Sequence, residues 1–363
     1  MKRIGIYPSG NQLLLLKAIV FPKAEALVFW RQWTATVSPT LSTAEFLLDS
    51  IDENTRRLLS LVYANLHTSG DPWIELLKGY ARHVWVRQQR LQQEADILLE
   101  AFALNGLNPI VLKGLAMSRS SHSIMTFRVM NDLDIYVAKP FRQKAFELLN
   151  QLGFTIIPKD EMYLPIIHAA QFQNRQHIEV DLHWHLFQEH LDGKMDALLV
   201  AERLESSGKY SGYRILNPTA QFFHSLYQCS HWDALPNIRW VADCAMIGRS
   251  ESLDWNAIIK WTEQLQFQSF VPDALAFLQD EMQVEIPDFV FEKLEKIAEN
   301  SDPAHYFLWT CKPKSLSRFW VGPIRSWYHW KAFTKGTTAD LFELFWFKAK
   351  SAFIHRASKF GLG

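Results

Sequence analysis

Residues 131–137 read Asn-Asp-Leu-Asp-Ile-Tyr-Val, and this alternation of polar and apolar side chains decides the fold. Successive side chains of a β-strand point to opposite faces, so the pattern predicts a strand with one apolar face. The other face would carry Asp132 and Asp134. Two carboxylates on one face can bind the same cation, and Mg²⁺ prefers such oxygen ligands. An isolated Asp-x-Asp is more often a solvated strand end, so neighbouring segments must decide between the two interpretations.

Residues 177–183 repeat the alternation with the sequence His-Ile-Glu-Val-Asp-Leu-His. Glu179, Asp181 and His183 would share the polar face of a second strand. Carboxylates on neighbouring strands repel one another unless a cation compensates them. We therefore expect Asp181 to join the two acids of the first strand in one metal site, with Glu179 as its rival. His183 and His185 lack a third soft ligand, so a supporting or acceptor-site role for His183 is favoured over zinc binding.

Residues 109–115 read Pro-Ile-Val-Leu-Lys-Gly-Leu, an apolar strand that runs into a short helix. Glycine lets the backbone approach a phosphate, and the start of a helix favours anions. Lys113 could add a point charge beside Gly114. A plain strand–helix turn is the alternative, because the spacing of a Walker P-loop and the Rossmann glycine pattern are both absent from the sequence.

Around these segments the hydrophobic periodicity predicts an α+β fold, with a small mixed sheet embedded between N-terminal and C-terminal helical regions. Residues 141–152 are expected to form a helix that stops at Gly153, and residues 169–183 a hairpin that turns at Asn174-Arg175. From Leu186 onward we expect helices. The predicted organisation is 1–106 helical, 107–186 the α/β core, 187–311 helical, and 312–363 a basic aromatic tail.

The composition suits a soluble, well-packed chain, with 48% hydrophobic and 21% charged residues among 363. Cys229, Cys244 and Cys311 form an odd set without metal-type spacing, which favours a reducing compartment. We find neither a signal peptide nor an apolar run long enough to span a bilayer. These features predict a cytoplasmic protein without a transmembrane segment.

The formal charge is zero but unevenly distributed. Residues 312–363 carry ten Lys or Arg against two Asp or Glu, so a tail of net +8 follows a body of net −8. Within residues 340–360, aromatic and small residues recur at helical spacing beside basic ones. Such a helix could contact an anionic membrane surface, a partner or nucleic acid. Packing on the chain's own acidic body is the favoured interpretation.

The ordered series of motifs resembles the uncharacterised bacterial nucleotidyltransferase family within the DNA polymerase β-like superfamily. The resemblance is carried by these segments: Phe29–Trp33, Leu112-Lys113-Gly114, Arg128 before Asp132-Leu133-Asp134, Asp181–Trp184, Ile238–Asp243, and Asp254-Trp255.

That resemblance implies that Asp132, Asp134 and Asp181 bind Mg²⁺ (or Mn²⁺), and that Asp181 also activates the attacking hydroxyl. It implies in-line attack on the α-phosphate of a nucleoside triphosphate such as ATP, with two metal ions stabilising the attacking and leaving oxygens. Lys113 and Gly114 occupy the position at which members of this superfamily usually have a Gly-Ser or Gly-Gly turn for the triphosphate. Arg128 could neutralise phosphate charge or orient Asp132 through a salt bridge.

We therefore predict a metal-dependent nucleotidyltransferase that moves a nucleoside monophosphate onto a hydroxyl of a small molecule or protein. The alternatives are a nucleotide-binding module without turnover and a template-free enzyme acting on nucleic acid. Arg239 and Asp243, four residues apart, could form a helix-surface pair or line the acceptor pocket. The identity of the acceptor stays open at this point.

Overall fold

The computed structural model describes residues 7–37, 51–119, 123–158, 164, 167–188, 193–205, 212–228, 238–264 and 270–299. The basic aromatic tail, including residues 340–360, lies outside these ranges, as do Cys229 and Cys311. Cys244 is a buried free thiol. Within the described ranges every helix is too short or too polar to cross a bilayer.

The N-terminal region is helical, as predicted, and its helix starts follow local capping chemistry. Ser9 and Gln12 form a capping box at the start of α1 (Gly10–Val20). At the start of α4 (Glu53–Leu66), the Asp52 side chain accepts a hydrogen bond from the Thr55 amide. Pro72 occupies the first turn of its helix. Residues 38–50 of this region lie outside the described residues. The helices are α1 (Gly10–Val20), α2 (Lys23–Val37), α4 (Glu53–Leu66), α5 (Pro72–Leu76) and α6 (Lys78–Leu104).

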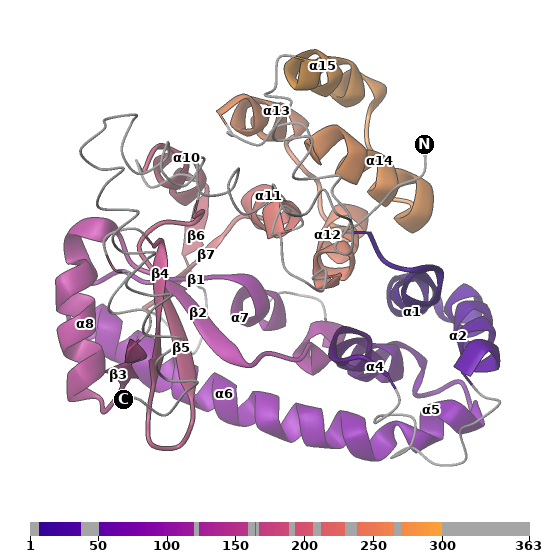
Figure 1. Ribbon diagram of the computed structural model, residues 1–363, viewed down its shortest axis with the longest axis horizontal. Helices are drawn as coiled ribbons and strands as arrows, with labels where there is room; N and C mark the ends of the chain where they lie inside the picture. The colour runs from indigo at the N-terminus through magenta and orange to yellow at the C-terminus, as the bar shows by residue number, and fades with distance from the viewer. Residues whose placement is uncertain are drawn as a thin grey trace, which may run out of the picture.

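The described strands form one mixed sheet with the order β3-β4-β5-β2-β1-β7-β6. The central strands β2 and β5 are parallel, whereas β4 and β5 form the predicted antiparallel hairpin. This arrangement confirms the predicted α+β class, with a small sheet among helices (Figure 1). The strands are β1 (Ile110–Val111), β2 (Asp132–Tyr136), β3 (Thr155–Ile156), β4 (Ala169–Gln173), β5 (Glu179–His183), β6 (Arg203–Glu205) and β7 (Arg214–Leu216).

Two strands were not predicted, since only helices were expected after Leu186. That prediction is wrong for β6 and β7, which form an antiparallel pair at one edge of the sheet. β7 is parallel to β1, with Ile110 opposite Arg214. Strands of three residues contain too few side chains for an alternating pattern to stand out.

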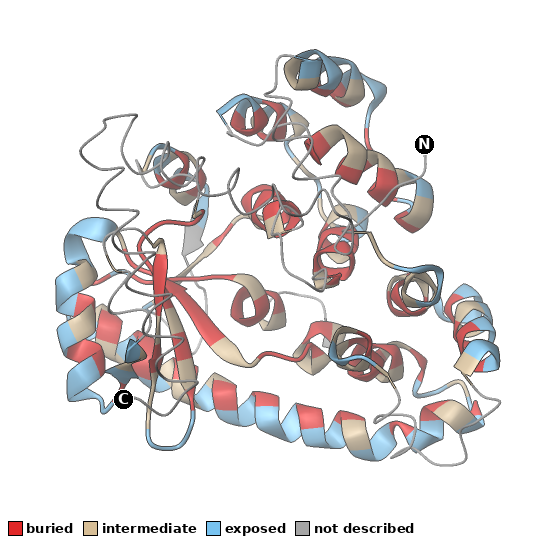
Figure 2. Cartoon of the chain, in the orientation of Figure 1, coloured by how far each residue is buried: buried red, intermediate tan, exposed pale blue. Residues whose placement is uncertain are grey.

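The apolar face of the sheet packs against the long helix α6 and against α8 (Arg142–Gln151). Leu133, Val180 and Phe172 from three strands share one buried cluster with Leu98 and Leu149 from the two helices. Figure 2 shows the buried stripe of α6 turned toward the rest of the protein and its opposite side exposed. Gly153 ends α8 with a φ of +84°, as the predicted helix stop requires.

The polar face of the sheet is turned toward the remaining helices. A short helix, α7, follows β1 directly, and residues of α11 and α12 line a cavity together with β2. A second hydrophobic cluster joins these C-terminal helices to α1 and α4. The elements are α7 (Lys113–Ser118), η2 (Ser123–Phe127), η3 (Lys139–Phe141), α10 (Lys194–Ala201), α11 (Pro218–Tyr227), α12 (Arg239–Ser250), α13 (Trp255–Gln264), α14 (Phe270–Met282) and α15 (Asp288–Glu299).

Candidate active site

The register between β2 and β5 brings the predicted acids together. Asp134 lies opposite Asp181, and Asp132 lies opposite Glu179, on adjacent parallel strands. The alternating pattern turns the apolar residues between them toward the α6 side and the acids toward the other side. The predicted sharing of one polar face is therefore confirmed.

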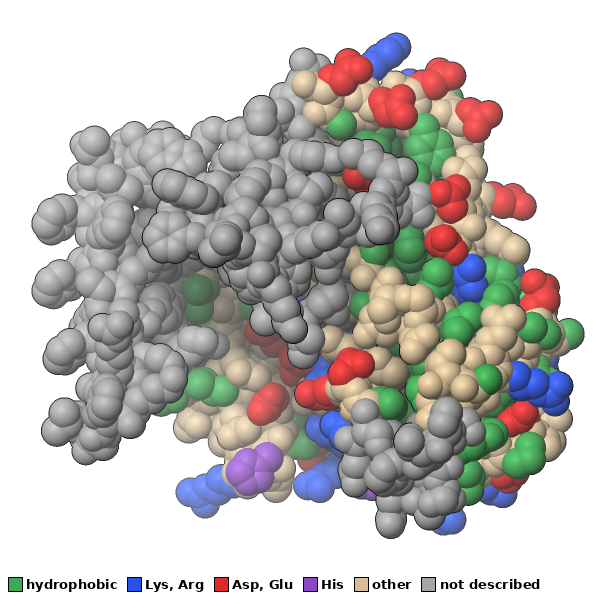
Figure 3. Space-filling model, turned by 45° about the vertical axis from the view of Figure 1, so that its right-hand side comes forward, with side chains coloured by type: hydrophobic (Ala, Val, Ile, Leu, Met, Phe, Trp, Pro, Cys, Tyr) green, Lys and Arg blue, Asp and Glu red, His purple; other side chains and the backbone are tan. Residues whose placement is uncertain are grey.

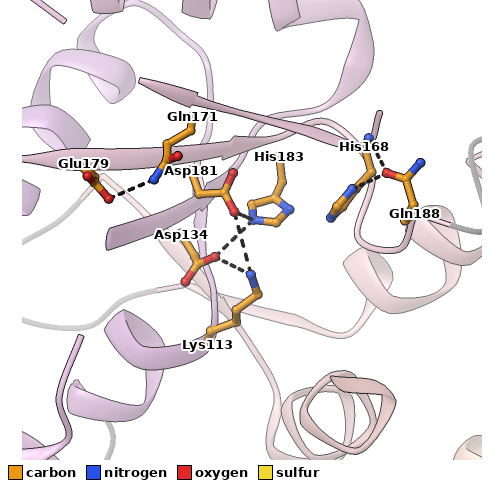
Figure 4. A network of polar contacts seen from close by, with 8 residues as sticks. All are labelled: Lys113, Asp134, His168, Gln171, Glu179, Asp181, His183 and Gln188. Carbon is orange, nitrogen blue, oxygen red and sulfur yellow. Dashed lines mark hydrogen bonds and ion pairs between the residues drawn. The ribbon is translucent and has the colours of Figure 1, made fainter. Parts of the chain in front are cut away.

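Two cationic side chains lie between Asp134 and Asp181. His183 Nε2 is 3.1 Å from Asp134 Oδ1 and 3.1 Å from Asp181 Oδ2. Lys113 Nζ is 2.5 Å from Asp134 Oδ1 and 3.9 Å from Asp181 Oδ2. Figure 4 shows the four side chains converging from β2, β5 and the start of α7.

The opposite charges in this cluster stabilise the ionised forms of one another. Burial alone would lower the pKa of His183, but Asp181 and the hydrogen bonds to both acids raise it to about 9. Burial likewise opposes the charge of Lys113, yet the adjacent carboxylates raise its pKa above the ordinary value. Burial would raise the pKa of Asp181, but His183 and Lys113 hold it well below the usual range. All four groups are therefore charged at neutral pH.

Asp132 has a different environment at the beginning of β2. The neighbouring charge of Asp134, and then burial, raises the pKa of Asp132 to about 6. It is half-buried and faces the same side as Asp134. The pKa of Asp132 thus lies about one unit below neutrality, much higher than the pKa values of the two acids held by cations.

The residues fit a divalent cation. Asp134, Asp181 and His183 each offer one ligand atom, and these atoms lie within 4.8 Å of one another. Two carboxylates suit Mg²⁺ or Mn²⁺, and the imidazole is more typical of transition metals. Lys113 and His183 supply positive charge to these acids in the metal-free protein. A metal ion bound there would displace the Lys113 ammonium, and His183 would have to lose a proton to become a ligand. The grouping contains His183 where Asp132 was predicted as a ligand, with Asp132 nearby on the same face.

Lys113 and Gly114 begin α7 in a tightly packed turn. Lys113 has a φ of +45°, an uncommon conformation for a residue with a Cβ. A Cβ on Gly114 would stand 2.5 Å from Arg128 Nη1 and 2.6 Å from Met130 Cγ. Glycine at this position is therefore required by the close packing of α7, a reason that the sequence pattern did not reveal.

Arg128 and Asp243 form a buried bidentate ion pair, with Nε–Oδ1 and Nη2–Oδ2 distances of 2.8 and 2.7 Å. The predicted alternative in which Arg128 orients Asp132 through a salt bridge is wrong, because the carboxylate that it binds is Asp243. The expected pair of Arg239 and Asp243 does not lie on a helix surface, because Asp243 is buried and its carboxylate binds Arg128. Arg239 Nη1 donates to the Val129 carbonyl at 3.2 Å. These partners are more than 100 positions apart, and local spacing cannot predict them.

Arg239 and Asp243 both line a cavity, and their predicted place in an acceptor pocket stays a prediction. This cavity of about 110 Å³ lies beside β2, and its walls bring three basic and three acidic side chains together; Asp181 is not among its lining residues. Its lining residues are Lys113, Gly114, Arg128, Met130, Asp132, Asp134, Ser225, Gln228, Arg239, Trp240 and Asp243.

Glu179, the predicted rival of Asp181, is held outside the charged cluster. Its carboxylate accepts hydrogen bonds from Gln171 Nε2 at 2.8 Å and Gln173 Nε2 at 3.0 Å (Figure 4). Both glutamines lie on β4, two residues apart and on one face. The geometry therefore favours Asp181 over Glu179 as the third acid.

His168 is a site neighbour that the sequence patterns did not single out. Its ring centroid lies 5.2 Å from that of His183, and its Nδ1 lies 2.7 Å from Gln188 Oε1. Burial, together with the charge on His183, lowers the pKa of His168 to about 3, so its ring is neutral. The hairpin register places Ala169 opposite His183, so extending that predicted hairpin by one residue could have located His168.

Comparison with known proteins bears on this geometry. The sequence model of a family described as "Uncharacterised nucleotidyltransferase" matches residues 53–282, which is more than half of the chain. The chain belongs to this family. The region shared with the nucleotidyltransferase family includes all the residues of the charged cluster and of the cavity. No curated protein and no solved structure matches the chain.

Membership in this nucleotidyltransferase family confirms the family-level resemblance found in the sequence motifs and supports nucleotidyl transfer as the activity. It agrees with an acidic cluster that can hold a metal beside a basic turn. Within the described residues, one face of the sheet thus carries both the acidic cluster and the lysine of the adjacent turn.

Proposed function

We propose that this protein is a metal-dependent nucleotidyltransferase of the DNA polymerase β-like superfamily. It would transfer a nucleoside monophosphate from a nucleoside triphosphate to a hydroxyl of a small molecule or protein, and release pyrophosphate. The observation that carries the proposal is the pair Asp134 and Asp181, in register on parallel strands and neutralised by Lys113 and His183. Structural acids seldom converge in this way unless a cation compensates their repulsion.

Asp134 and Asp181 would hold Mg²⁺ or Mn²⁺, with Asp132 on the same face as a further ligand. His183 would join them only after losing the proton that the two acids stabilise. When bound, divalent metal would neutralise phosphate charge and stabilise the attacking and leaving oxygens. Lys113 would leave Asp134 and pair with the triphosphate, because an ammonium binds a polyanion at least as well as one carboxylate. The side chain is partly exposed and can make this movement.

Asp181 would accept the proton of the acceptor hydroxyl as that oxygen forms a bond to the α-phosphorus. The bond from the α-phosphorus to the bridging oxygen breaks, and pyrophosphate leaves with its electron pair. Asp181 is a weak base while both cations lower its pKa. Movement of Lys113 toward phosphate would remove one of these charges and strengthen the base when substrate is present.

A small molecule or protein acceptor is favoured over nucleic acid by the charge of the C-terminal helices. Between residues 250 and 299, the sequence has eleven Asp or Glu and three Lys. Figure 3 shows acidic side chains spread over this part of the described surface. Such a surface repels a phosphate backbone, whose binding depends on basic residues.

The test measures label transfer from α-labelled nucleoside triphosphates to components of a cell extract, with Mg²⁺ or Mn²⁺ present. Asp134→Asn should abolish labelling, since it removes the carboxylate shared by the metal site and Lys113. Asp280→Asn, a matched change on the exposed side of α14, should label as the wild type does. Undiminished labelling by a folded Asp134→Asn variant would contradict the assignment. Triphosphate binding without labelled product across all acceptors would instead favour a binding module.

A further inference from the structure

The outer side of the long helix α6 carries large apolar side chains that are exposed. Val86, Ile97 and Leu104 are 54%, 52% and 82% exposed. Figure 2 shows this side of α6 exposed, opposite the buried stripe that faces the rest of the protein. Single exposed apolar residues are common on protein surfaces, so what matters is whether these three are arranged in a pattern.

The three residues lie on one regular seam. Its positions are alternately four and three residues apart, and the average of about 3.5 is the repeat with which two helices pack along each other. Gly79 and His83 continue this spacing toward the start of α6, and both are exposed. All the remaining positions of the seam are exposed as well: Val86, Arg90, Gln93, Ile97, Glu100 and Leu104.

The charges of α6 are divided between its two halves. Residues 78–90, the basic half, contain four Lys or Arg and no acid, whereas residues 94–104, the acidic half, contain three Asp or Glu and no base. Neither Arg90 nor Glu100 takes part in the ion pairs that α6 makes with other described residues. This order does not stabilise an isolated helix, because acidic residues are favourable near the N-terminus of a helix and basic ones near its C-terminus.

A second copy of α6 that runs antiparallel to the first fits this seam. A two-fold axis repeats each contact between the copies, so each pair of facing residues occurs twice. With the axis midway along the seam, Val86 of one copy lies against Ile97 of the other. Leu104 then lies against Gly79, where the absence of a side chain leaves open space. The alignment therefore covers all three apolar side chains.

The same alignment matches the charges. The basic half of each copy lies along the acidic half of the other. His83 faces Glu100, and Arg90 faces the neutral Gln93. A parallel arrangement would instead place Arg90 against Arg90 and Glu100 against Glu100, and such contacts between like charges cost free energy. The antiparallel direction is therefore the favoured one.

An anionic lipid surface fits the same side of α6 less well. It would attract the basic half but repel the acidic half. Ile97 and Leu104, which would have to enter the lipid, both lie in the acidic half. A second copy of the chain compensates both halves at once.

We propose that the outer side of α6 is the interface of an antiparallel homodimer, in which the seam from Gly79 to Leu104 packs on the same seam of a second copy. This inference goes beyond the proposed function and does not depend on it. The buried stripe of α6 faces the sheet, and the acids lie on the other side of that sheet. The candidate active site of each copy would therefore lie away from the interface.

Sedimentation velocity of the full-length protein over a concentration series measures the dimer. Ile97→Glu should weaken association by about 100-fold or more, because it places an unpaired carboxylate in the interface at two symmetry-related positions. Val28→Glu is the matched control. Val28 is 53% exposed, against 52% for Ile97, but it lies on α2. The control should associate as the wild type does.

An exchanged pair of charges tests the direction of the helices. Val86→Lys should also weaken association. Val86→Lys combined with Ile97→Glu should restore it, because the new lysine of each copy would face the new glutamate of the other. In a parallel dimer like charges would meet, and the combined variant would stay monomeric. Circular dichroism would check that each variant is folded.

Three outcomes overturn the proposal. They are wild-type protein that stays monomeric over the whole series, folded Ile97→Glu that associates as the wild type does, and a combined variant that does not regain association. Flotation with vesicles of phosphatidylserine and phosphatidylcholine examines the lipid alternative. Vesicle binding by monomeric wild-type protein that is lost in Arg90→Glu would assign this side of α6 to a lipid surface instead.

Discussion

Lys113 Nζ lies 2.5 Å from Asp134 Oδ1, so the ammonium group of this lysine occupies the position beside the acids that a metal ion would take. A divalent cation that binds Asp134 must compete with this ammonium. The same lysine is proposed to bind the triphosphate, which makes metal and nucleotide binding interdependent. Nucleotide that draws Lys113 away would expose the carboxylate to metal.

Lys113→Met separates the two effects. Removal of the competing charge should tighten Mn²⁺ binding to the nucleotide-free protein by about tenfold or more, because charges a few ångströms apart interact by several kcal/mol at a protein surface. Transfer activity should fall, since the phosphate contact is lost. Electron paramagnetic resonance of free Mn²⁺ measures the first effect. Equal Mn²⁺ affinity in variant and wild type would show that Lys113 does not guard the site.

Asp132→Asn should stabilise the metal-free protein above pH 6. The folded-state pKa of about 6 exceeds the ordinary 3.8, so the folded protein holds this proton more tightly than the unfolded chain. The contribution of Asp132 to stability therefore declines as pH rises from about 4 through 6. At pH 7 the gain for the asparagine variant should be about 3 kcal/mol, because the pKa is raised by about 2 and each unit corresponds to about 1.36 kcal/mol. Urea unfolding at pH 4 and pH 7 checks it, and a gain that does not grow with pH would contradict it.

Asp181→Asn and Glu179→Gln form a matched comparison of neighbouring acids on β5. Loss of the proposed base should reduce kcat by about 10²- to 10⁴-fold. Glu179 is held by two glutamine amides outside the cluster, so its substitution should change kcat far less. The assignment of the third acid would be reversed if Glu179→Gln were the inactive variant. Steady-state transfer assays with any identified acceptor measure both.

Gly114→Ala should destabilise the protein and impair the site together. The added methyl group would press on Arg128 and Met130, and overpacking of this kind costs about 1–3 kcal/mol. Gly79→Ala is the control, because a Cβ there meets nothing within 4 Å and alanine favours the helix. Thermal unfolding should show a lower Tm for the first variant and an equal or higher one for the second. An unchanged Tm for Gly114→Ala would mean that α7 shifts freely.

Strong alternation made the centre of this fold predictable. The five residues of β2 and of β5 each place acids on one face, and this pattern predicted both strands and the Asp134–Asp181 pair. The short strands β6 and β7 carry no comparable pattern. Hydrophobic periodicity describes a single segment and contains no information on which strands pair. It therefore could not predict the pairing of β1 with β7, in which Ile110 lies opposite Arg214.

Long-range pairing limited the prediction of the site. Spacing within α12 suggested an ion pair between Asp243 and Arg239, whereas in the structure the Asp243 carboxylate forms its bidentate ion pair with Arg128. A buried guanidinium requires a carboxylate, but sequence alone does not say from which element it comes. His183 was expected in a supporting role, and its contact with both acids depends on a strand register that only the fold defines.

The Arg128–Asp243 pair has a practical consequence for dissecting the protein. A fragment that ends near residue 186 would contain the acids of β2 and β5 but would lack Asp243, so the buried Arg128 would have no carboxylate partner. It would also lack β7, so one edge of β1 would be unpaired. Such a fragment is a poor choice for expression or for transplanting the activity into another scaffold. A useful piece must extend beyond Asp243 and keep α14, because Phe277 of that helix packs on Trp240 of α12.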